Sequence, residues 1–452
     1  MSSGQLAEIF KAYDVRGVVP DQWDATAARR IGAAFATVVE AAGVVVGHDM
    51  RPSSPELAAA FAEGAAAAGA DVTSIGLAST DMLYFASGRL DLPGAMFTAS
   101  HNPARYNGIK FCRSGARPIS QATGLTEIRE LAEGGGPAPA PRAGTVATDD
   151  QLTAYAEFLR SLVPLHDVRP LRVAVDAANG MAGHTAPAVF AGTPVEVLPL
   201  YFELDGTFPN HEANPLEPAN LRDLQAFVRE TGADCGLAFD GDADRCFVVD
   251  EHGESVSPSA LTALIAVREL AREPGARVIH NLITSKAVPE LVRAHGGEPV
   301  RTRVGHSFIK AEMAKTQAVF GGEHSAHYYF RDFWYADSGM LAALHLLAAL
   351  GRSSGGLAQL LAEYARYAGS GEVNSEVADP AAALERVERA YAGQPDVTID
   401  HLDGVTVSSA DWWFNVRPSN TEPLVRLNVE AADGARLSRL RDEVLAVIRH
   451  DP

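Results

Sequence analysis

The chain has 452 residues, which is too long for one hydrophobic core and predicts about three or four domains. Its formal net charge of −19 argues against nucleic acid as a partner, because phosphate backbones are bound by basic faces. No apolar run reaches the roughly 18 residues of a membrane span. The 3 cysteines, without a CxxC pair, predict buried thiols in a reducing cytoplasm.

The same order of elements recurs along the chain: an apolar strand, a polar or Gly-rich loop, an Ala-rich helix and a second strand. It occurs at residues 44–75, 171–200 and 277–304. Strands that alternate with helices at this spacing predict parallel α/β units, and their recurrence favours an internal repeat with one unit in each domain.

The end of the chain has a different pattern. Short strands are predicted at 405–408, 412–416 and 424–430, and a closing helix at 437–449, which suits a smaller α+β domain. A Gly/Pro-rich stretch at 134–144 predicts the first domain boundary. Weaker signals of a domain boundary follow further along the chain. We therefore predict four domains, at residues 1–145, 146–251, 252–368 and 369–452.

The first motif with chemical potential is TASHNP at residues 98–103, which follows an apolar run. It places Ser100 in a loop at the carboxyl end of a strand, where α/β folds keep their functional sites. A serine hydroxyl is a weak nucleophile unless a base or a metal activates it. On its own, this segment is more typical of a polar turn.

The second motif is DGDADR at residues 240–245, again directly after a predicted strand. Three carboxylates at alternate positions on a turn can converge on one hard cation, and oxygen ligands suit Mg²⁺, Mn²⁺ or Ca²⁺. An EF-hand loop shares this start, but its sixth position requires glycine and here it is Arg245. Two other interpretations are a phosphatase with Asp240 as its nucleophile and a purely structural turn.

Two further loops carry polar groups. GGEHSAH at 321–327 offers a carboxylate, a hydroxyl and two imidazoles, and carboxylates in such loops often accept hydrogen bonds from sugar hydroxyls. RPSNTEP at 417–423 combines a guanidinium, hydroxyls, an amide and turn backbone N–H groups, which together make a cradle for an anion.

In this order, the four loops resemble those of the α-D-phosphohexomutase family, and YDVRG at 13–17 and NGIK at 107–110 add to the match. The resemblance extends over nearly the whole chain. It implies four domains around a central cleft, of which three are related α/β domains and the fourth is a smaller C-terminal α+β domain.

The resemblance also implies residue roles. Ser100 would carry a phosphoryl group and, with Asp240, Asp242 and Asp244, bind one Mg²⁺. Lys110 and His327 would be the acid/base pair, supported by His101 and Arg16. The residues implied to contact the sugar or its phosphates are Arg245, His306, Glu323, His324, Ser325, Arg417, Ser419, Asn420 and Thr421. Some relatives have a substrate-binding lysine at the position of Ile283. In this chain the lysine comes three residues later, at Lys286, and whether it contacts the substrate is left open.

Within the family, the run from residue 322 to 339 is most similar to bacterial phosphomannomutases. This implies interconversion of mannose 6-phosphate and mannose 1-phosphate through a phosphoserine and a hexose 1,6-bisphosphate, by a monomer or dimer. Phosphoglucomutase as the main activity and a Mg²⁺-dependent sugar phosphatase are the alternatives.

Overall fold

The computed structural model describes residues 5–418 and 424–450. The chain divides into two compact units. The first contains Met1–Val256 and Ser325–Leu360, and the second contains Ser257–His324 and Leu361–Pro452. The boundary between the units therefore falls inside the predicted third domain, after His324 of the GGEHSAH loop.

The first sheet of the first unit has the strand order β1-β5-β4-β2-β3-β7. Strands β4, β2, β3 and β7 run parallel to one another, whereas β5 is antiparallel to β1 and β4 and also pairs with β6. The strands are β1 (Asp14–Val18), β2 (Gly43–His48), β3 (Asp71–Leu77), β4 (Gly94–Phe97), β5 (Tyr106–Arg113), β6 (Arg117–Pro118) and β7 (Val146–Thr148). The helices are α1 (Gln5–Ile9), α2 (Ala25–Val39), α3 (Ser54–Ala67), α4 (Thr80–Leu90) and α5 (Leu125–Glu133).

Strand β7 lies just beyond the predicted first domain boundary at residue 145. It pairs in parallel with β3, from Val72↔Val146 to Ser74↔Thr148, and so it still belongs to the first sheet. The Gly/Pro-rich stretch therefore crosses back to the edge of this sheet before the second sheet begins.

The second sheet of the first unit has the order β12-β11-β10-β8-β9. Its strands are β8 (Leu171–Asp176), β9 (Val195–Leu200), β10 (Cys235–Phe239), β11 (Cys246–Val249) and β12 (Ser255–Val256). The helices that follow the first sheet are α6 (Leu152–Leu162), α7 (Ala182–Phe190) and α8 (Arg222–Thr231). The unit also contains the antiparallel pair β16 (Tyr328–Phe330) and β17 (Ala336–Asp337) and helix α12 (Gly339–Leu350), while α13 spans Leu357–Leu361.

In the second unit, β13 (Arg277–Asn281) pairs in parallel with β14 (Glu298–Thr302) and β15 (Phe320–Gly322). Its helices are α9 (Pro258–Arg272), α10 (Ala287–Ala294) and α11 (His306–Thr316). These elements supply the third α/β repeat that the sequence pattern predicts.

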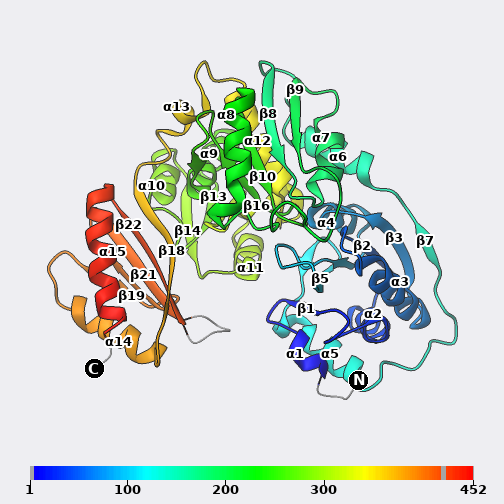
Figure 1. Ribbon diagram of the computed structural model, residues 1–452. Helices are drawn as coiled ribbons and strands as arrows, with labels where there is room; N and C mark the ends of the chain where they lie inside the picture. The colour runs from blue at the N-terminus through cyan, green and yellow to red at the C-terminus, as the bar shows by residue number, and fades with distance from the viewer. Residues whose placement is uncertain (1–4, 419–423, 451–452) are drawn as a thin grey trace. The chain divides into compact units, whose positions relative to one another are not determined.

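The C-terminal sheet of the second unit is antiparallel, with the order β18-β22-β21-β20-β19. Its elements are β18 (Ala368–Glu376), α14 (Pro380–Tyr391), β19 (Thr398–Asp400), β20 (Val405–Ser408), β21 (Trp412–Pro418), β22 (Leu424–Ala431) and α15 (Gly434–Ile448). Helices α14 and α15 lie along one face of this sheet (Figure 1). Helix α15 begins earlier than predicted, because the side chain of Asp433 accepts a hydrogen bond from Arg436 N and caps the first turn.

Alternation along the C-terminal strands explains why α14 and α15 cover the same face of the sheet. Phe414, Val416, Leu427 and Val429 point into the core that α14 and α15 close. The intervening residues, which include Asn415, Arg417, Arg426 and Asn428, form a polar face on the opposite side. The polar face thus presents charged groups instead of a second core.

The predicted fold class is confirmed by three mixed α/β sheets and one antiparallel C-terminal sheet. Cys112, Cys235 and Cys246 are buried, as predicted. In the described parts of the chain, no helix is both long enough and apolar enough to span a membrane.

Candidate active site

Ser100 lies in the loop after β4 and is almost completely buried, with 5% of its surface exposed. Its φ of 50° places it in the left-handed region, which is rare for residues with a side chain and is common in strained functional loops. The hydroxyl of Thr98 accepts a hydrogen bond from Ser100 N at 2.9 Å. Ser100 Oγ donates to Asp240 Oδ2 at 2.7 Å and lies 3.1 Å from His101 Nδ1.

Arg51 holds this loop in place, a role that the sequence did not predict. Its guanidinium is fully buried and lies 3.2 Å from Asp49 Oδ2. It donates hydrogen bonds of 2.6 to 3.0 Å to the backbone carbonyls of Ser100, Asn102, Pro103 and Tyr106. The available signal was its place in the polar loop after β2, whose carboxyl end lies beside that of β4.

The three aspartates converge at the end of β10. Asp240, Asp242 and Asp244 are buried, and each offers a ligand oxygen within 4.8 Å of the others. Within the described residues, Asp242 Oδ1 and Asp244 Oδ1 are buried without a hydrogen-bond partner. Buried, unpaired carboxylate oxygens that face one another suit a hard divalent cation such as Mg²⁺, and so the residues fit the predicted metal.

Gly241 explains how the aspartate loop can approach the serine loop. A Cβ at this position would lie 2.5 Å from the carbonyl oxygen of Ser100, which is closer than real Cβ contacts occur. Only glycine therefore allows Asp240 to reach the Ser100 hydroxyl without moving one of the two loops.

Thr80, at the start of α4, is a second residue that sequence reasoning missed. Its hydroxyl donates to Asp242 Oδ2 at 2.6 Å, and its backbone N–H donates to the Asp242 carbonyl at 3.0 Å. These contacts hold one oxygen of Asp242 and leave Oδ1 as the oxygen without a partner.

Lys110 on β5 also contacts the aspartates. Its ammonium donates to Asp242 Oδ2 at 2.7 Å and to Asp244 Oδ2 at 2.5 Å. Although burial opposes its charge, the two carboxylates hold the pKa of Lys110 well above its ordinary value. Against the effect of burial, the Lys110 ammonium in turn lowers the pKa of Asp242.

Asp240 is held by Arg245, whose Nε donates to Asp240 Oδ2 at 2.9 Å. Burial nevertheless raises the pKa of Asp240 above its ordinary value, and the neighbouring carboxylates add to this effect. A bound cation would favour the ionised form of all three aspartates.

Two residues predicted to have a supporting role are His101, in the serine loop, and Arg16, which contacts this loop from β1. The Arg16 guanidinium donates to Asn102 Oδ1 and to Asp14 Oδ2, each at 2.6 Å. Burial, together with the nearby Arg245 and Arg16 charges, lowers the pKa of His101 well below its ordinary value, and so this imidazole is neutral at pH 7.

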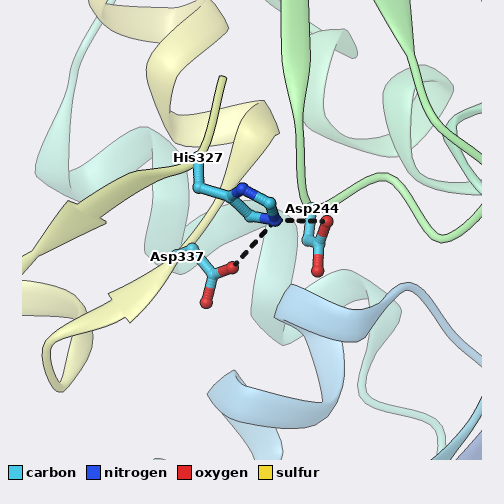
Figure 2. Close-up of side chains that lie close together, drawn as sticks. All are labelled: Asp244, His327 and Asp337. Carbon is cyan, nitrogen blue, oxygen red and sulfur yellow. Dashed lines mark ion pairs between the residues drawn. The ribbon is translucent and has the colours of Figure 1, made fainter. Parts of the chain in front are cut away.

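His327 reaches the aspartate loop through a β-bridge with Arg245. Figure 2 shows its ring pointing toward two carboxylates: His327 Nε2 lies 3.7 Å from Asp244 Oδ1 and 4.0 Å from Asp337 Oδ2. Its other ring nitrogen, Nδ1, is 3.1 Å from Ser325 Oγ. Asp337, on β17, was not predicted as a site residue from the sequence.

The second unit contains the other predicted contacts with the substrate. Glu323, at the end of β15, is buried, and its Oε1 accepts hydrogen bonds from Asn281 Nδ2 at 3.0 Å and Gly305 N at 3.3 Å. His324 Nδ1 lies 3.4 Å from Ser259 Oγ, and burial lowers the pKa of His324.

The remaining predicted residues belong to the C-terminal sheet and to two loops. Arg417 forms an ion pair of 2.7 Å with Glu372. The Lys286 ammonium donates hydrogen bonds to the backbone carbonyls of Ser409 and Ala410. His306 is the first residue of α11. Ser419, Asn420 and Thr421 lie outside the described residues.

Comparison with known proteins gives a consistent result along the chain. The family models for domains I, II and III of phosphoglucomutase/phosphomannomutase, each described as alpha/beta/alpha, match residues 7–136, 153–253 and 257–367. The model for the C-terminal domain of the same family matches residues 372–447.

Curated relatives match over nearly their full length. A phosphomannomutase of Salmonella typhimurium is 42% identical over 450 residues, which cover 97% of this chain and 98% of that protein. A protein of Xanthomonas campestris named "Phosphohexose mutases" is 43% identical over 440 residues, with the same shares covered. The phosphomannomutase of Escherichia coli K12 is 39% identical over 451 residues, or 98% of this chain and 99% of that protein.

A solved structure agrees with these sequence matches. A phosphoglucomutase/phosphomannomutase family protein of Burkholderia thailandensis has a TM-score of 0.89 and 34% identity, and the match covers 99% of this chain and 98% of that one. The chain therefore belongs to the phosphoglucomutase/phosphomannomutase family and is a phosphohexomutase.

Proposed function

We propose that this phosphohexomutase is a phosphomannomutase, which interconverts mannose 6-phosphate and mannose 1-phosphate through a phosphoserine at Ser100 and a hexose 1,6-bisphosphate. The observation that carries the proposal is the contact of Ser100 Oγ with Asp240 Oδ2 at 2.7 Å, inside a buried set of three aspartates. Relatives named phosphomannomutase support the choice of mannose.

In the proposed reaction, the bond between phosphorus and Ser100 Oγ breaks as the free sugar hydroxyl forms a new bond to the same phosphorus. For the acid/base pair we propose His327, which would accept the hydroxyl proton, and Lys110, which would supply a proton to the departing Ser100 Oγ. Lys110 is held as an ammonium by two carboxylates, and so it suits the role of acid and charge stabiliser. His327, with an imidazole that faces two carboxylates, suits the role of base.

A Mg²⁺ ion bound by Asp240, Asp242, Asp244 and the phosphoserine would offset negative charge on the transferring group. Arg245 keeps Asp240 oriented for this task. Arg16 and Arg51 add positive charge around the serine loop without offering a competing nucleophile.

The second half of the reaction requires the other phosphate of the bisphosphate to react with Ser100. We propose that Arg417, together with Ser419, Asn420 and Thr421, binds whichever phosphate is not reacting. The sugar hydroxyls would be contacted by Glu323, His324 and Ser325, with His306 as a further contact.

Phosphoglucomutase activity is the second candidate, because mannose and glucose differ only at C2 and one relative bears the broader name "Phosphohexose mutases". A phosphatase that uses Asp240 as its nucleophile is less well supported. Asp240 Oδ2 already accepts from Ser100 Oγ and Arg245 Nε, and these hydrogen bonds weaken a carboxylate as a nucleophile.

For the wider properties of the protein, we propose four domains with the boundaries predicted above, adjusted so that β7 stays with the first. We propose small-molecule sugar phosphates as the partners, with neither nucleic acid nor a membrane, and a monomer or dimer as the working form. We also propose a cytoplasmic location, because three buried thiols are typical of a protein in a reducing compartment.

Substitution of the carrier tests the proposal directly. Ser100→Ala should lower kcat by more than about a thousandfold and remove a covalent phosphate from the intact-mass spectrum. Ser161→Ala, which changes an exposed serine on α6, is the control and should keep both. Full activity of Ser100→Ala would show that the carrier role is wrong, and stoichiometric release of inorganic phosphate would favour the phosphatase.

A coupled assay that compares mannose 1-phosphate with glucose 1-phosphate decides between the two mutase activities. A higher kcat/KM for mannose 1-phosphate is expected, and a clear preference for glucose 1-phosphate would reverse the assignment.

A further inference from the structure

Two arginines lie side by side on neighbouring strands of the C-terminal sheet. Arg417 on β21 and Arg426 on β22 are directly opposite in the antiparallel register. Like charges in directly opposite positions repel, and so this pair requires a counter-charge nearby. Within the described residues, the Nε atoms of both arginines are buried and have no hydrogen-bond partner.

Glu372 supplies the counter-charge from the adjacent strand, β18. Its Oε2 lies 2.7 Å from Arg417 Nη2, and its Oε1 lies 3.3 Å from Arg426 Nη1. One carboxylate thus bridges two guanidinium groups, which leaves the three side chains with a net charge of about +1.

The backbone of β18 is shaped to place this carboxylate. Gly371 has a φ of +66°, and the register with β22 shifts between Gly369 and Glu372. Such an irregularity re-aims the following side chain, and it brings Glu372 opposite Asn428, on the same polar face as Arg426.

The Arg417 side chain is therefore already paired before any phosphate arrives. It is 13% exposed, and Glu372 contacts its Nη2, one of the nitrogens that a phosphate oxygen would also seek. A sugar phosphate that binds Arg417 must compete with this carboxylate or share the guanidinium with it. The competition weakens binding, because a bound carboxylate repels a phosphate dianion.

We propose that Glu372 is a built-in counter-ion that sets how tightly the Arg417 site binds sugar phosphates. A moderate affinity serves a mutase whose bisphosphate must release one phosphate and present the other. The inference rests on the proposed role of Arg417 in phosphate binding. Glu372 acts through Arg417 and Arg426 and is therefore a positioning residue.

The test measures binding of mannose 1-phosphate and of inorganic phosphate by calorimetry to the full-length Ser100→Ala chain, with and without Glu372→Gln. Because Glu372→Gln keeps the shape and removes the charge, both ligands should bind about tenfold tighter. With Ser100 present, Glu372→Gln should lower KM and also lower kcat, since the product leaves more slowly and the bisphosphate exchanges its two phosphates at Arg417 more slowly. A purely structural role would not tighten binding.

Two further variants serve as controls for the effect of charge at Glu372. Glu298→Gln removes an equally charged, exposed partner of Arg277 in the same unit and should leave the affinity unchanged. Glu372→Asp keeps the charge and should bind nearly as the starting chain does, whether or not Glu372→Gln folds well. Unchanged or weaker binding by Glu372→Gln, or equal tightening by Glu372→Asp, would overturn the proposal.

The same data separate this proposal from the proposed function. If the unaltered chain fails to interconvert mannose phosphates but Glu372→Gln still tightens phosphate binding, the counter-ion role stands and the phosphomannomutase assignment fails. If interconversion is observed but the affinity does not respond to Glu372→Gln, only the counter-ion role fails.

Discussion

Ser100 is held in a backbone conformation that residues with side chains rarely adopt, and Arg51 is the residue that stabilises it. The guanidinium donates to the carbonyl of Ser100 itself at 2.9 Å and to three further carbonyls of the same segment. A buried arginine can do this because its planar group carries five donors in a fixed geometry. The strain at Ser100 is thus offset by hydrogen bonds from a different loop.

Removal of this guanidinium should strongly destabilise the first unit. Arg51→Met leaves Asp49 as an uncompensated buried charge and leaves four carbonyls without their donor, and so we expect a loss of about 3–5 kcal/mol in the free energy of unfolding. Chemical denaturation measures this loss. Arg29→Met is the matched control, because Arg29 pairs with Glu63 at the surface and its side chain is 56% exposed. A loss below about 1 kcal/mol for Arg51→Met would contradict the role given to this residue.

At the scale of elements, the start of α10 docks on the polar face of the C-terminal sheet within the second unit. Lys286 N donates to Glu430 Oε1 at 2.9 Å, and Trp413 Nε1 donates to the same oxygen at 2.7 Å. The side chains of Leu282 and Ile283 pack against Trp413. Burial raises the pKa of Glu430, and the hydrogen bonds from both sides oppose this rise.

The Lys286 ammonium extends this contact to the turn between β20 and β21. We expect Lys286→Met to weaken the docking by about 1 kcal/mol, since its bonds to two carbonyls are partly exposed. Hydrogen–deuterium exchange of the amides in β21 and β22 should then be roughly fivefold faster. Lys315→Met, which alters a lysine with a side chain that is 75% exposed, should not change this exchange. Unaltered exchange in Lys286→Met, with a large rise in KM instead, would favour direct contact with substrate.

At the scale of the whole molecule, Asp81 joins three distant segments of the first unit. Its carboxylate, on α4, accepts from Tyr155 OH on α6 at 2.7 Å and from Ser338 Oγ, just before α12, at 2.6 Å. Ser79 also donates to it. Burial raises the pKa of Asp81 to about 6, although these hydrogen bonds favour the charged form.

A raised pKa makes this junction sensitive to pH in a defined direction. The folded state binds the Asp81 proton more tightly than the unfolded state does. The stability from this proton is therefore fully present below the ordinary aspartate pKa of 3.8, and it is lost as pH rises through the folded-state pKa of about 6.

The stability of the original chain relative to Asp81→Asn should accordingly fall by on the order of 1 kcal/mol between pH 5 and pH 7. Denaturation at both pH values measures the difference. Ser161→Ala removes no titrating group, and so the stability of the original chain relative to this variant should not change with pH. A stability difference from Asp81→Asn that is the same at pH 5 and pH 7 would show that Asp81 is ionised throughout this range.

Much of the fold and of the site could be predicted because it follows from local patterns. A buried strand followed by a polar loop places Ser100 after β4 and the aspartates after β10, and alternate spacing brings Asp240, Asp242 and Asp244 to one point. The order of these motifs also indicated the family, which the comparisons confirm. The roles of the individual site residues stay predictions, and those of Ser419, Asn420 and Thr421 concern residues outside the described parts.

The contacts that local patterns did not predict connect residues far apart in the chain. The sequence by itself determined the strand–loop–helix units, the loop that contains Ser100 and the aspartate triad, because these depend on periodicity and on chemistry within a few residues. Only the tertiary structure decided that Thr80 holds Asp242, 162 residues away, that Arg51 supports Ser100, and that Glu372 bridges Arg417 and Arg426. The physical reason is that hydrogen bonds and ion pairs between loops depend on strand order and register, which no short stretch of sequence specifies.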